Sequence, residues 1–518
     1  MVNAIGRLLP EHLEGYGGLV PFTGAFSGRV PARRHAPPVK SVRPGERKVV
    51  EGLDALFDRI PIGHGMTLSF HHHFRNGDRV LNLVLATAAK RGIKGLKVAP
   101  SALFPVHAPL IEHVRRGVVA DLDTNYMAGP VARAVSEGLF PRPVVLRTHG
   151  GRARAIECGE LKIDVAFIAA PAADDYGNIN GVTGPSACGS LGYALPDAEY
   201  ADFVVAVTDH LVEYPLAPVS IPQTRVDWVA RVEAAGDPSG IVSGTTRITG
   251  DGVQLKIARA AAEVIEAAGL IRDGLSFQTG AGGASLATAH FLGGFMDRAG
   301  VSGSFGLGGV TGQMVAMLEQ GLVRKILDVQ GFDLEAVRSL AANPGHLEIG
   351  SSFYANPFNC GCAVNRLDCA VLGATEIDTD FNVNVVSGSD GIILGGSGGH
   401  SDAAAGAGLT VIVASLVRGR LPIVRDRVLT ATTPGETVDV LVTEHGVAVN
   451  PRRADILSRL KDAGLATTDI HTLKALAERL AAVPAPLDLG EKIVAVVEYR
   501  DGTVIDVLRQ TRNASRTE

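Results

Sequence analysis

The chain has 518 residues, of which 46% are hydrophobic and 20% are charged, and its formal net charge is −5. This length exceeds what one hydrophobic core usually serves, so we expect two or more domains. The slightly acidic balance favours neither nucleic acid nor an anionic membrane as a partner.

Two sequence features bear on compartment and metal content. No apolar signal core follows Met1 and no apolar run approaches membrane-spanning length, so we predict a cytoplasmic protein. The five cysteines are sparse and odd in number, which is typical of free thiols. Cys360 and Cys362 lack two further ligands at the spacing of a zinc site, so we predict no metal.

The N-terminal segment differs in composition from the rest. Residues 1–48 are rich in proline and arginine and predict an extended arm. From about Val50 onward, apolar strands, glycine turns and amphipathic helices alternate along the chain. This alternation predicts an α/β fold with a largely parallel sheet.

The first chemically notable stretch is Phe70-His71-His72-His73-Phe74-Arg75. Imidazole and guanidinium groups together could hold a polycarboxylate, and His72 and Arg75 are our candidates for that role. Adjacent side chains on a strand alternate faces, which argues against a shared metal. A hydrogen-bonded core histidine remains an open alternative for each imidazole, as it does for His149.

An internal repeat relates residues 162–180 to residues 366–384. The segments align without gaps, and Asp174 and Asn178 match Asp378 and Asn382. The offset of 204 residues is the length of a domain, which favours a duplicated unit.

The repeat predicts two similar domains in tandem. We place the first over residues 49–235 and the second over residues 236–518, with a seam near residues 225–250. Two related domains that face each other form a cleft, which is a usual place for a small-molecule site.

The second copy contains a strand-like run followed by a glycine loop and a helix. Gly280, Gly282 and Gly283 form the loop, and we expect the helix to begin near Ser285 and to end at Gly300. Glycines let a ligand approach the bare backbone, and a helix start offers free N–H groups to anionic or acyl oxygens. Tight packing without a ligand is the alternative.

A second glycine loop lies further along the chain. Gly395, Gly396, Gly398 and Gly399 precede His400. An acyl-transfer enzyme needs backbone N–H donors where a carbonyl oxygen becomes anionic, and this loop could supply them. A flexible loop or close sheet packing remains the alternative.

Glu376 lies between the two loops, and its carboxylate could act as a nucleophile. The competing interpretation is a carboxylate that fixes the turn at Asn382 and Asn384. The repeat favours this second interpretation, because the first copy keeps the turn residues but has Ala172 in place of the glutamate.

The C-terminal part predicts two amphipathic helices over residues 453–482, around Gly464. Asp501-Gly502 then joins two apolar runs, which is the pattern of a β-hairpin. We expect this hairpin to close the second domain.

With these motifs placed, residues 50–510 resemble the citrate lyase alpha chain family, which is related to the CoA-transferases. The resemblance is carried in chain order by SFHHHFRNGD, DDYGNINGVTG, SFQTGAGGASLA, TEIDTDFNVNV and GGSGGH. It implies two similar CoA-transferase-like α/β domains. Many CoA-transferases place a nucleophilic glutamate where this chain has Gln313, and a neutral amide is a poor nucleophile.

The resemblance also implies an activity. The chain would transfer the thiol of an acyl-carrier protein from acetyl-ACP to citrate, giving citryl-ACP and acetate. A citrate carboxylate would attack the thioester directly, through a mixed anhydride. The implied substrate is the CoA-like phosphopantetheine thioester of the carrier, with no cofactor bound to the chain itself.

The implied partners are a citryl-ACP lyase beta chain and a gamma acyl-carrier protein, in an oligomer. Two alternatives stay open. The first is a transferase or hydrolase acting on free CoA thioesters of citramalate or another acid. The second is a ligand-sensing or scaffold protein without catalysis.

The resemblance and the loops together define the candidate site. The catalytic candidates are Gln313, Gly395, Gly396, Gly398, Gly399 and Glu376. The substrate-binding candidates are His72, Arg75 and His400 for citrate, and Gly280, Gly282 and Gly283 for the thioester arm.

Overall fold

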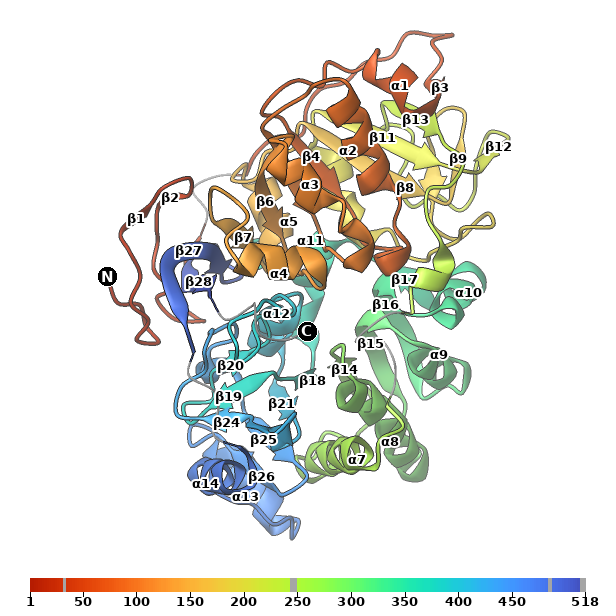
Figure 1. Ribbon diagram of the computed structural model, residues 1–518. Coiled ribbons are helices and arrows are strands. Elements are labelled where there is room, and N and C mark those ends of the chain that lie inside the picture. The colour runs from red at the N-terminus through yellow and green to blue at the C-terminus, as the bar shows by residue number, and fades with distance from the viewer. Residues whose placement is uncertain (31–33, 243–248, 483–486, 513–518) are drawn as a thin grey trace.

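A computed structural model describes residues 1–30, 34–242, 249–482 and 487–512 (Figure 1). It contains two large sheets with helices packed against them. The predicted seam near residues 225–250 includes residues 243–248, which lie outside the described part of the chain.

The first sheet has ten strands in the order β28-β27-β7-β6-β5-β4-β8-β11-β13-β3. Its strands are β3 (Val49–Glu51), β4 (Thr67–Phe70), β5 (Leu96–Pro100), β6 (Val119–Thr124), β7 (Val144–Leu146), β8 (Val165–Ala170), β11 (Phe203–Thr208), β13 (Trp228–Arg231), β27 (Leu489–Glu498) and β28 (Val504–Thr511). Strand β8 is fully buried and entirely apolar, as expected of a central parallel strand that helices cover on both faces.

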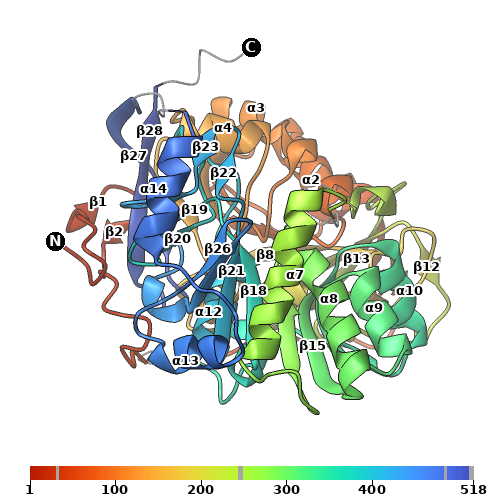
Figure 2. The same ribbon diagram turned by 90° about the horizontal axis from the view of Figure 1, so that it is seen from below.

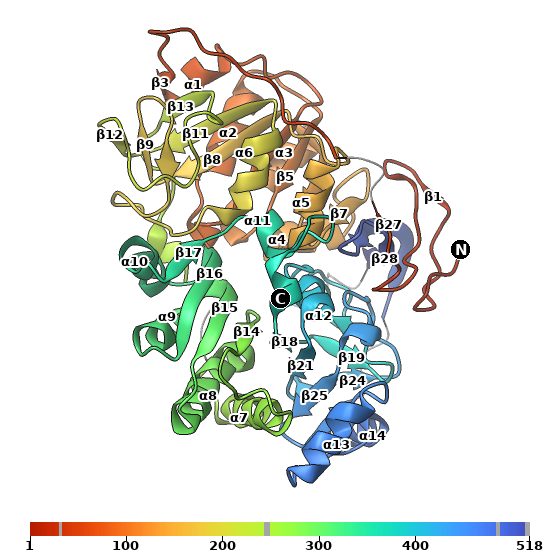
Figure 3. The ribbon, with the colours of Figure 1, turned by 180° about the vertical axis from the view of Figure 1, so that it is seen from behind.

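Six helices accompany this sheet. They are α1 (Gly52–Phe57), α2 (Val80–Lys90), α3 (Leu110–Arg115), α4 (Pro130–Ser136), α5 (His149–Glu157) and α6 (Leu195–Tyr200). Figure 1 shows α2 and α3 in front of the sheet, and Figure 3 shows α5 and α6 on the opposite side.

The second sheet has eight strands in the order β17-β16-β15-β14-β18-β21-β25-β26. Its strands are β14 (Ser276–Thr279), β15 (Gly303–Val310), β16 (Val323–Gly331), β17 (His346–Glu348), β18 (Cys369–Gly373), β21 (Leu409–Val413), β25 (Val440–Thr443) and β26 (Gly446–Val449). All pairs are parallel except β25 with β26.

The helices of the second half include the two predicted after residue 453. They are α7 (Gly252–Ala267), α8 (Gly283–Ala299), α9 (Gly312–Glu319), α10 (Leu334–Ala342), α11 (Ser351–Ala355), α12 (His400–Gly406), α13 (Ala454–Asp462) and α14 (Ile470–Leu480). Seen from below, α7 to α10 lie on one side of the molecule and α13 and α14 on the other (Figure 2).

The two sheets repeat one strand order. Strands β4 to β7 run outward from a central crossover to β8, and strands β14 to β17 run outward from a crossover to β18. The predicted α/β class with two similar halves is confirmed at this level. The common origin of the halves and their exact boundaries stay predictions.

The sequence repeat coincides with a small three-stranded sheet in each half. Strands β9 (Ala172–Asp174) and β10 (Ile179–Asn180) pair with β12 (Leu211–Val212), and β19 (Glu376–Asp378) and β20 (Val383–Asn384) pair with β24 (Val424–Arg425). In both turns an asparagine amide donates to the aspartate four residues before it, Asn178 to Asp174 and Asn382 to Asp378. Matching residues therefore build matching turns.

The C-terminal hairpin corrects one expectation. It joins the first sheet, because β27 pairs in parallel with β7, with Val496 opposite Val145. Val494, Val497 and Ile505 belong to the hydrophobic core that surrounds the first sheet. The sequence pattern of a hairpin is local and does not say which sheet edge the hairpin will join.

The N-terminal arm packs against this hairpin. It contains the short pair β1 (His12–Leu13) and β2 (Gly17–Gly18), and its other described residues form turns and irregular chain without a helix. The Phe22 N–H donates to the Val504 carbonyl at 2.9 Å, and the Asn3 amide donates to the Ile505 carbonyl at 2.8 Å. Figure 1 shows the arm beside β27 and β28.

Helix α8 begins slightly earlier than predicted. Gly282 is its N-cap, and Ser285 lies inside the first turn, where its hydroxyl donates to the Val371 carbonyl at 3.2 Å. The predicted C-terminal end is confirmed, because Gly300 caps the helix with a left-handed φ of 64°.

Among the described residues, no helix has the length and apolarity needed to cross a bilayer. The same residues contain no group of three or more His, Cys, Asp or Glu side chains arranged to hold a metal ion.

Candidate functional site

A cavity of about 500 Å³ lies between the two halves of the molecule. The first half contributes side chains that include His72, Arg75, Tyr126, His149 and Tyr193. The second half contributes both glycine loops, and these contain cavity residues Gly280, Gly282, Gly395, Gly396, Gly398 and Gly399. The prediction that the two loops meet at an interdomain cleft is therefore confirmed.

His72 lies just after β4 and presents a neutral imidazole to the cavity. Its Nδ1 lies 2.6 Å from Ser101 Oγ, and its ring stacks on Tyr193 at 4.6 Å between centroids. Burial, followed by the nearby charges of His149 and Arg75, holds the pKa of His72 well below its usual value. Nε2 is the ring nitrogen left for a ligand among the described contacts.

Arg75 supplies the buried positive charge of the cavity. Its side chain lies 4.7 Å from the Phe104 ring centroid and 5.5 Å from that of Phe332, so aromatic faces from both halves flank the guanidinium. Burial lowers its pKa to about 10, which leaves the group charged at neutral pH. Its φ of 52° is rare for a residue with a side chain, and such strain is typical of functional positions.

His149 is a cavity residue that we did not single out as a substrate ligand. It begins α5, its main-chain N–H donates to the Gly398 carbonyl at 2.8 Å, and its ring packs on Tyr193 at 4.3 Å. Burial lowers its pKa to about 3, so the ring is neutral. Its Nδ1 is buried without a hydrogen-bond partner in the described structure.

The loop at residues 395–399 has two engaged and two open N–H groups. Gly395 donates to the Val386 carbonyl and Gly398 to the Asn125 carbonyl, each at 3.2 Å. Within the described residues, no acceptor is found for the N–H groups of Gly396 and Gly399. Of the four glycines predicted to bind an oxyanion, only Gly396 and Gly399 therefore stay candidates for that role.

Steric room explains why Gly396 and Gly399 carry no side chain. A Cβ at Gly396 would overlap the Asn125 carbonyl oxygen, and a Cβ at Gly399 would overlap the Tyr354 hydroxyl. The loop can lie this close to its neighbours only because both residues are glycine.

The loop at residues 280–283 divides in the same way. Gly280 and Gly282 line the cavity, and the Gly280 N–H donates to the Val371 carbonyl at 2.8 Å. Gly283 does not line the cavity. A Cβ at this position would lie 2.7 Å from the Thr249 Cβ, so the glycine is needed for close packing against Thr249. Gly282, the N-cap of α8, lines the cavity, whereas no described residue of α8 itself belongs to the cavity wall.

His400 lines the cavity but has no free ring nitrogen. Nδ1 lies 2.7 Å from Thr433 Oγ1, and Nε2 lies 2.8 Å from the Gly373 carbonyl. Burial lowers its pKa to about 4. The geometry therefore favours a histidine that holds the loop in place over the predicted citrate ligand.

Glu376 and Gln313 lie outside the cavity walls. Glu376 is fully buried, accepts from the Asn384 amide at 3.1 Å and the Leu429 N–H at 2.9 Å, and pairs with Arg425. These contacts support the turn-fixing interpretation over the nucleophile. Gln313 is in the first turn of α9.

Gln278 and Tyr354 line the cavity and were missed by the sequence analysis. The Gln278 amide donates to the Tyr354 hydroxyl at 2.8 Å, and its Oε1 is buried without a partner in the described structure. Gln278 could have been noticed, because it lies two residues before Gly280 of the first glycine loop. No local pattern marks Tyr354, which comes from α11 and reaches the cavity only in the folded chain.

Asp402 ties the two halves together behind the cavity. Its carboxylate accepts from Thr148 Oγ1 at 3.0 Å and from the Gly150 N–H at 2.9 Å, both in the first half. Burial raises its pKa to about 6, although Arg500 opposes that shift. The glycine loop before α12 is therefore positioned by polar contacts across the domain interface.

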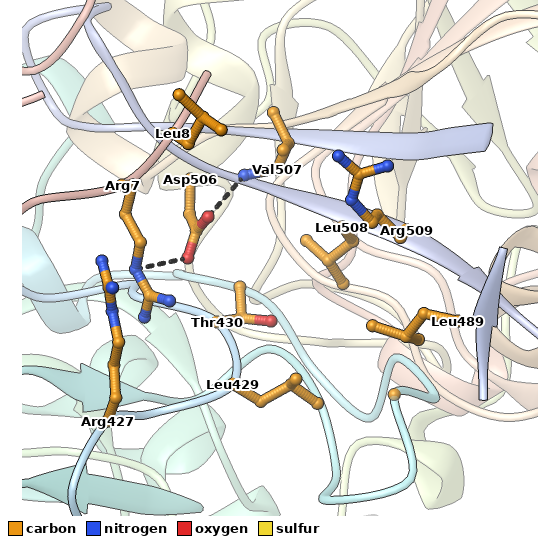
Figure 4. A pocket seen from close by; sticks show the side chains of 11 residues that line it. Arg7, Leu8, Arg427, Leu429, Thr430, Leu489, Asp506, Val507, Leu508 and Arg509 are labelled. Atoms are coloured by element: carbon orange, nitrogen blue, oxygen red, sulfur yellow. Dashed lines mark hydrogen bonds and ion pairs between the residues drawn. The ribbon is translucent and has the colours of Figure 1, made fainter. Parts of the chain in front are cut away.

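A second, smaller cavity of about 250 Å³ lies between the N-terminal arm, β28 and the loop at residues 427–430 (Figure 4). Arg7 lines it and pairs with Asp506 at 3.1 Å, and its Nη2 donates to the Val428 carbonyl at 2.8 Å. None of the predicted site residues lines this cavity, so we assign it no part in the site.

Comparison with known proteins gives consistent results. Residues 46–511 match the model of the family described as citrate lyase, alpha subunit (CitF). The citrate lyase alpha chain of Klebsiella pneumoniae is 50% identical over 469 residues, which cover 90% of this chain and 92% of that one.

Solved structures extend the comparison. A crystal structure of the alpha subunit of citrate lyase from Streptococcus mutans, in complex with citrate, has 46% identity and a TM-score of 0.94, covering 98% of this chain and 99% of that one. A 4-hydroxybutyrate CoA-transferase from Porphyromonas gingivalis has 16% identity and a TM-score of 0.53, covering 83% and 97%; this likeness concerns the fold alone.

Proposed function

The chain belongs to the citrate lyase alpha subunit family, and from this premise we propose that it transfers an acyl-carrier-protein thiol from acetate to citrate. The observation that carries the proposal is the citrate complex of the S. mutans relative, whose fold matches this chain at a TM-score of 0.94. The cavity described above supplies groups of the right chemistry for such a ligand.

Citrate recognition is assigned to the first-half wall. The Arg75 guanidinium offers charge and paired N–H donors to a carboxylate, in a site where burial strengthens the interaction. His72 Nε2 and the His149 imidazole can each bond a citrate oxygen while their rings stay neutral. Tyr193 packs against both imidazoles and fixes their orientation.

Thioester activation is assigned to the glycine loops. A carboxylate of citrate attacks the acetyl thioester carbonyl, a mixed anhydride forms and the thiolate leaves. The thiolate then attacks the citryl carbonyl, and acetate leaves. The open N–H groups of Gly396 and Gly399 can stabilise the oxyanion of each addition, so the chain acts mainly by positioning and charge stabilisation.

The proposed partners follow from this reaction. The acyl group arrives on the phosphopantetheine thioester of a carrier protein, and a lyase beta chain consumes the citryl thioester in a multi-subunit complex. A cytoplasmic location remains a prediction.

The test is a transfer assay with the purified chain. Acetylated carrier protein and citrate should yield acetate and a citryl thioester, detected by intact-protein mass spectrometry of the carrier. An Arg75→Gln variant should raise the KM for citrate, while an exposed Arg298→Gln variant serves as the matched control.

The assay also separates the alternatives. Acetyl-CoA as the better thiol donor would favour a free-CoA transferase, and water as the sole acyl acceptor would favour a hydrolase. Absence of any acyl exchange in the presence of all substrates would contradict an enzymatic role.

A further inference from the structure

A short hairpin stands at the mouth of the cavity, and we call it the mouth hairpin. It consists of β22 (Val417–Arg418), β23 (Leu421–Pro422) and the two turn residues between them. Arg418 and Leu421 line the cavity, as does Ile423 directly after the hairpin. The hairpin therefore forms part of the wall where the cavity opens.

The turn of the mouth hairpin holds an arginine in an unusual conformation. Gly419 and Arg420 have φ values of 53° and 69°, as a tight two-residue hairpin turn requires at both central positions. Glycine or asparagine satisfies this requirement with less strain than arginine does. Arg420 adopts this conformation at a cost in backbone strain, and such strain directs attention to a use for its charge.

Most N–H donors of the Arg418 guanidinium have no acceptor among the described residues. Its Nη2 donates to the Ala374 carbonyl at 3.2 Å, and this one contact leaves most of the guanidinium N–H groups open. Among the described residues, no carboxylate lies within 4.0 Å of Arg418 or Arg420, whereas Arg425 nearby pairs with Glu376. The side chain of Arg418 is exposed, yet neighbouring protein atoms lower its pKa by desolvation.

The mouth hairpin and the first glycine loop are both hydrogen-bonded to β18 or to the residue that follows it. Ala374, which holds Arg418, follows the carboxyl end of β18, and the Gly280 N–H donates to Val371 on the same strand. The cavity wall also contains the apolar side chains of Leu394, Leu421 and Ile423. Leu394 is 53% exposed, which places it where the cavity opens to solvent.

The cavity therefore has two chemically distinct ends. The inner end holds Arg75, His72 and the open N–H groups of the second glycine loop, which suit a carboxylate and a thioester carbonyl. The mouth has apolar side chains beside an uncompensated guanidinium. A slender thioester arm with a phosphate at its far end matches this order of groups.

We propose that Arg418, with Arg420 beside it, binds the phosphate of a phosphopantetheine-type arm while the thioester lies at the inner end of the cavity. The inference deepens the proposed function and rests on it. A guanidinium binds phosphate through paired, charge-assisted hydrogen bonds, which suits Arg better than Lys at this place. The phosphate could belong to a carrier-bound arm or to free coenzyme, and its chemistry at the mouth is the same.

The test compares two acetyl donors that differ only in the phosphate. Citrate-dependent acetate release is measured with acetyl-pantetheine and with acetyl-4′-phosphopantetheine, and the ratio of their kcat/KM values is reported for each variant. The wild-type ratio should favour the phosphorylated donor by about 10- to 100-fold, the value of a charge-assisted hydrogen bond. In Arg418→Gln and Arg420→Gln the ratio should fall toward 1.

Arg452→Gln is the matched control. Arg452 is exposed and precedes α13, and Figure 2 shows that helix well apart from β22. This variant removes the same charge, so a general electrostatic effect would lower its ratio too. The proposal expects the control to keep the wild-type ratio.

A structural role for Arg418 predicts a different result. If the contact with Ala374 only holds the hairpin in place, Arg418→Gln lowers kcat/KM for both donors equally and the ratio is unchanged. That result overturns the proposal, and so does a wild-type ratio near 1.

A binding measurement keeps the proposal separate from the proposed transfer reaction. Calorimetry with the unacylated thiols should show tighter binding of 4′-phosphopantetheine than of pantetheine by the wild-type protein, and no such difference for Arg418→Gln. If binding shows this pattern but no acetate is released, the phosphate site stands and the proposed function fails. Repeating the kinetics with acetyl-CoA and with acetylated carrier protein shows which source presents the phosphate.

Discussion

At the scale of single residues, burial decides which histidines can titrate and which can act. His72, His149 and His400 all line the cavity and are all held neutral by desolvation. They differ in their contacts, because His400 has both ring nitrogens engaged, whereas His72 has only Nδ1 engaged and the His149 ring has no hydrogen-bond partner among the described residues. Hydrogen bonding, more than residue type, separates a binding group from a supporting one.

His73 provides a pH prediction away from the cavity. It is 2% exposed and its Nε2 lies 2.7 Å from the Ala169 carbonyl; burial, together with His71, lowers its pKa to about 4. Because the folded-state pKa lies below the unfolded value of about 6.5, the stability contribution is present at pH 7 and is lost as the pH falls toward 4. His73→Gln keeps a donor but cannot be protonated. The loss of unfolding free energy between pH 7 and pH 5 should therefore shrink by about 2 kcal/mol.

Urea unfolding at the two pH values measures this difference. His471→Gln, which removes an exposed imidazole, is the control. An unchanged pH dependence in His73→Gln would show that His73 does not carry the acid sensitivity assigned to it.

Gly398 provides a second prediction at this scale. Its φ is 50°, and a Cβ would point toward His149 Nε2 at 3.5 Å. Gly398→Ala should cost about 1–2 kcal/mol of stability through backbone strain. It should lower transfer by about 10- to 100-fold, because relief of the strain at this left-handed φ shifts the loop that carries the open N–H groups of Gly396 and Gly399.

Gly464→Ala is the matched control, since its φ of 75° brings the same strain and no atom lies within 4 Å of the added Cβ. The control should lose stability and keep its activity. Full activity of Gly398→Ala would remove this loop from the site.

At the scale of elements, the sequence predicts the segment around residue 280 and the repeated turns correctly, but it assigns the C-terminal hairpin to the wrong sheet. The strand, glycine loop and helix around residue 280 and the repeated turns depend on nearby residues, so the sequence specifies them. The hairpin β27–β28 is also locally specified, but the sheet it joins depends on contacts with β7, which is more than 300 residues away in sequence.

The placement of that hairpin can be tested by one core substitution. Val496 is fully buried in β27 and lies between Val145 of β7 and Val507 of β28. Val496→Ala should lower the free energy of unfolding by about 2 kcal/mol through the lost packing. Hydrogen exchange should rise at residues 144–146 of the first sheet.

Val447→Ala, in β26 at the edge of the second sheet, is the control. Its effect should be seen at residues 440–443 and not in β7. Increased exchange in the second sheet for Val496→Ala would contradict the observed topology.

At the scale of the whole molecule, the site exists only because the halves face each other. Arg75 is flanked by Phe104 from the first half and Phe332 from the second, and Asp402 of the second half bonds Thr148 and Gly150 of the first. Citrate and the thioester are therefore assigned to opposite walls of one cavity, which suits a reaction that passes directly between them.

This arrangement predicts ternary-complex kinetics. The described cavity wall contains no aspartate or glutamate, and the buried carboxylate Glu376 is engaged with Asn384, Leu429 and Arg425. No free nucleophilic carboxylate therefore faces the cavity among these residues. Initial rates at varied citrate and acetyl thioester should give intersecting reciprocal plots.

A trapping experiment checks the same point. The chain is incubated with acetyl thioester alone, treated with hydroxylamine and analysed by peptide mass spectrometry. No hydroxamate should form on any carboxylate. A modified glutamate, with Glu376 the one to examine first, would establish an acyl-enzyme and exclude direct attack by citrate.

The sequence by itself determined the α/β class, the repeated turns, the two glycine loops and the family, because each depends on local spacing or on motifs read in order. It also singled out His72 and Arg75, which line the cavity, and their role as substrate ligands stays a prediction. Only the tertiary structure decided which loop N–H groups have no acceptor within the described protein. It also decided that His400 and Glu376 form internal hydrogen bonds, and that Tyr354 and Arg418 line the cavity. The physical reason is that a hydrogen-bond donor or acceptor is available to a ligand only if no neighbour in the folded chain has already engaged it, and those neighbours are distant in sequence.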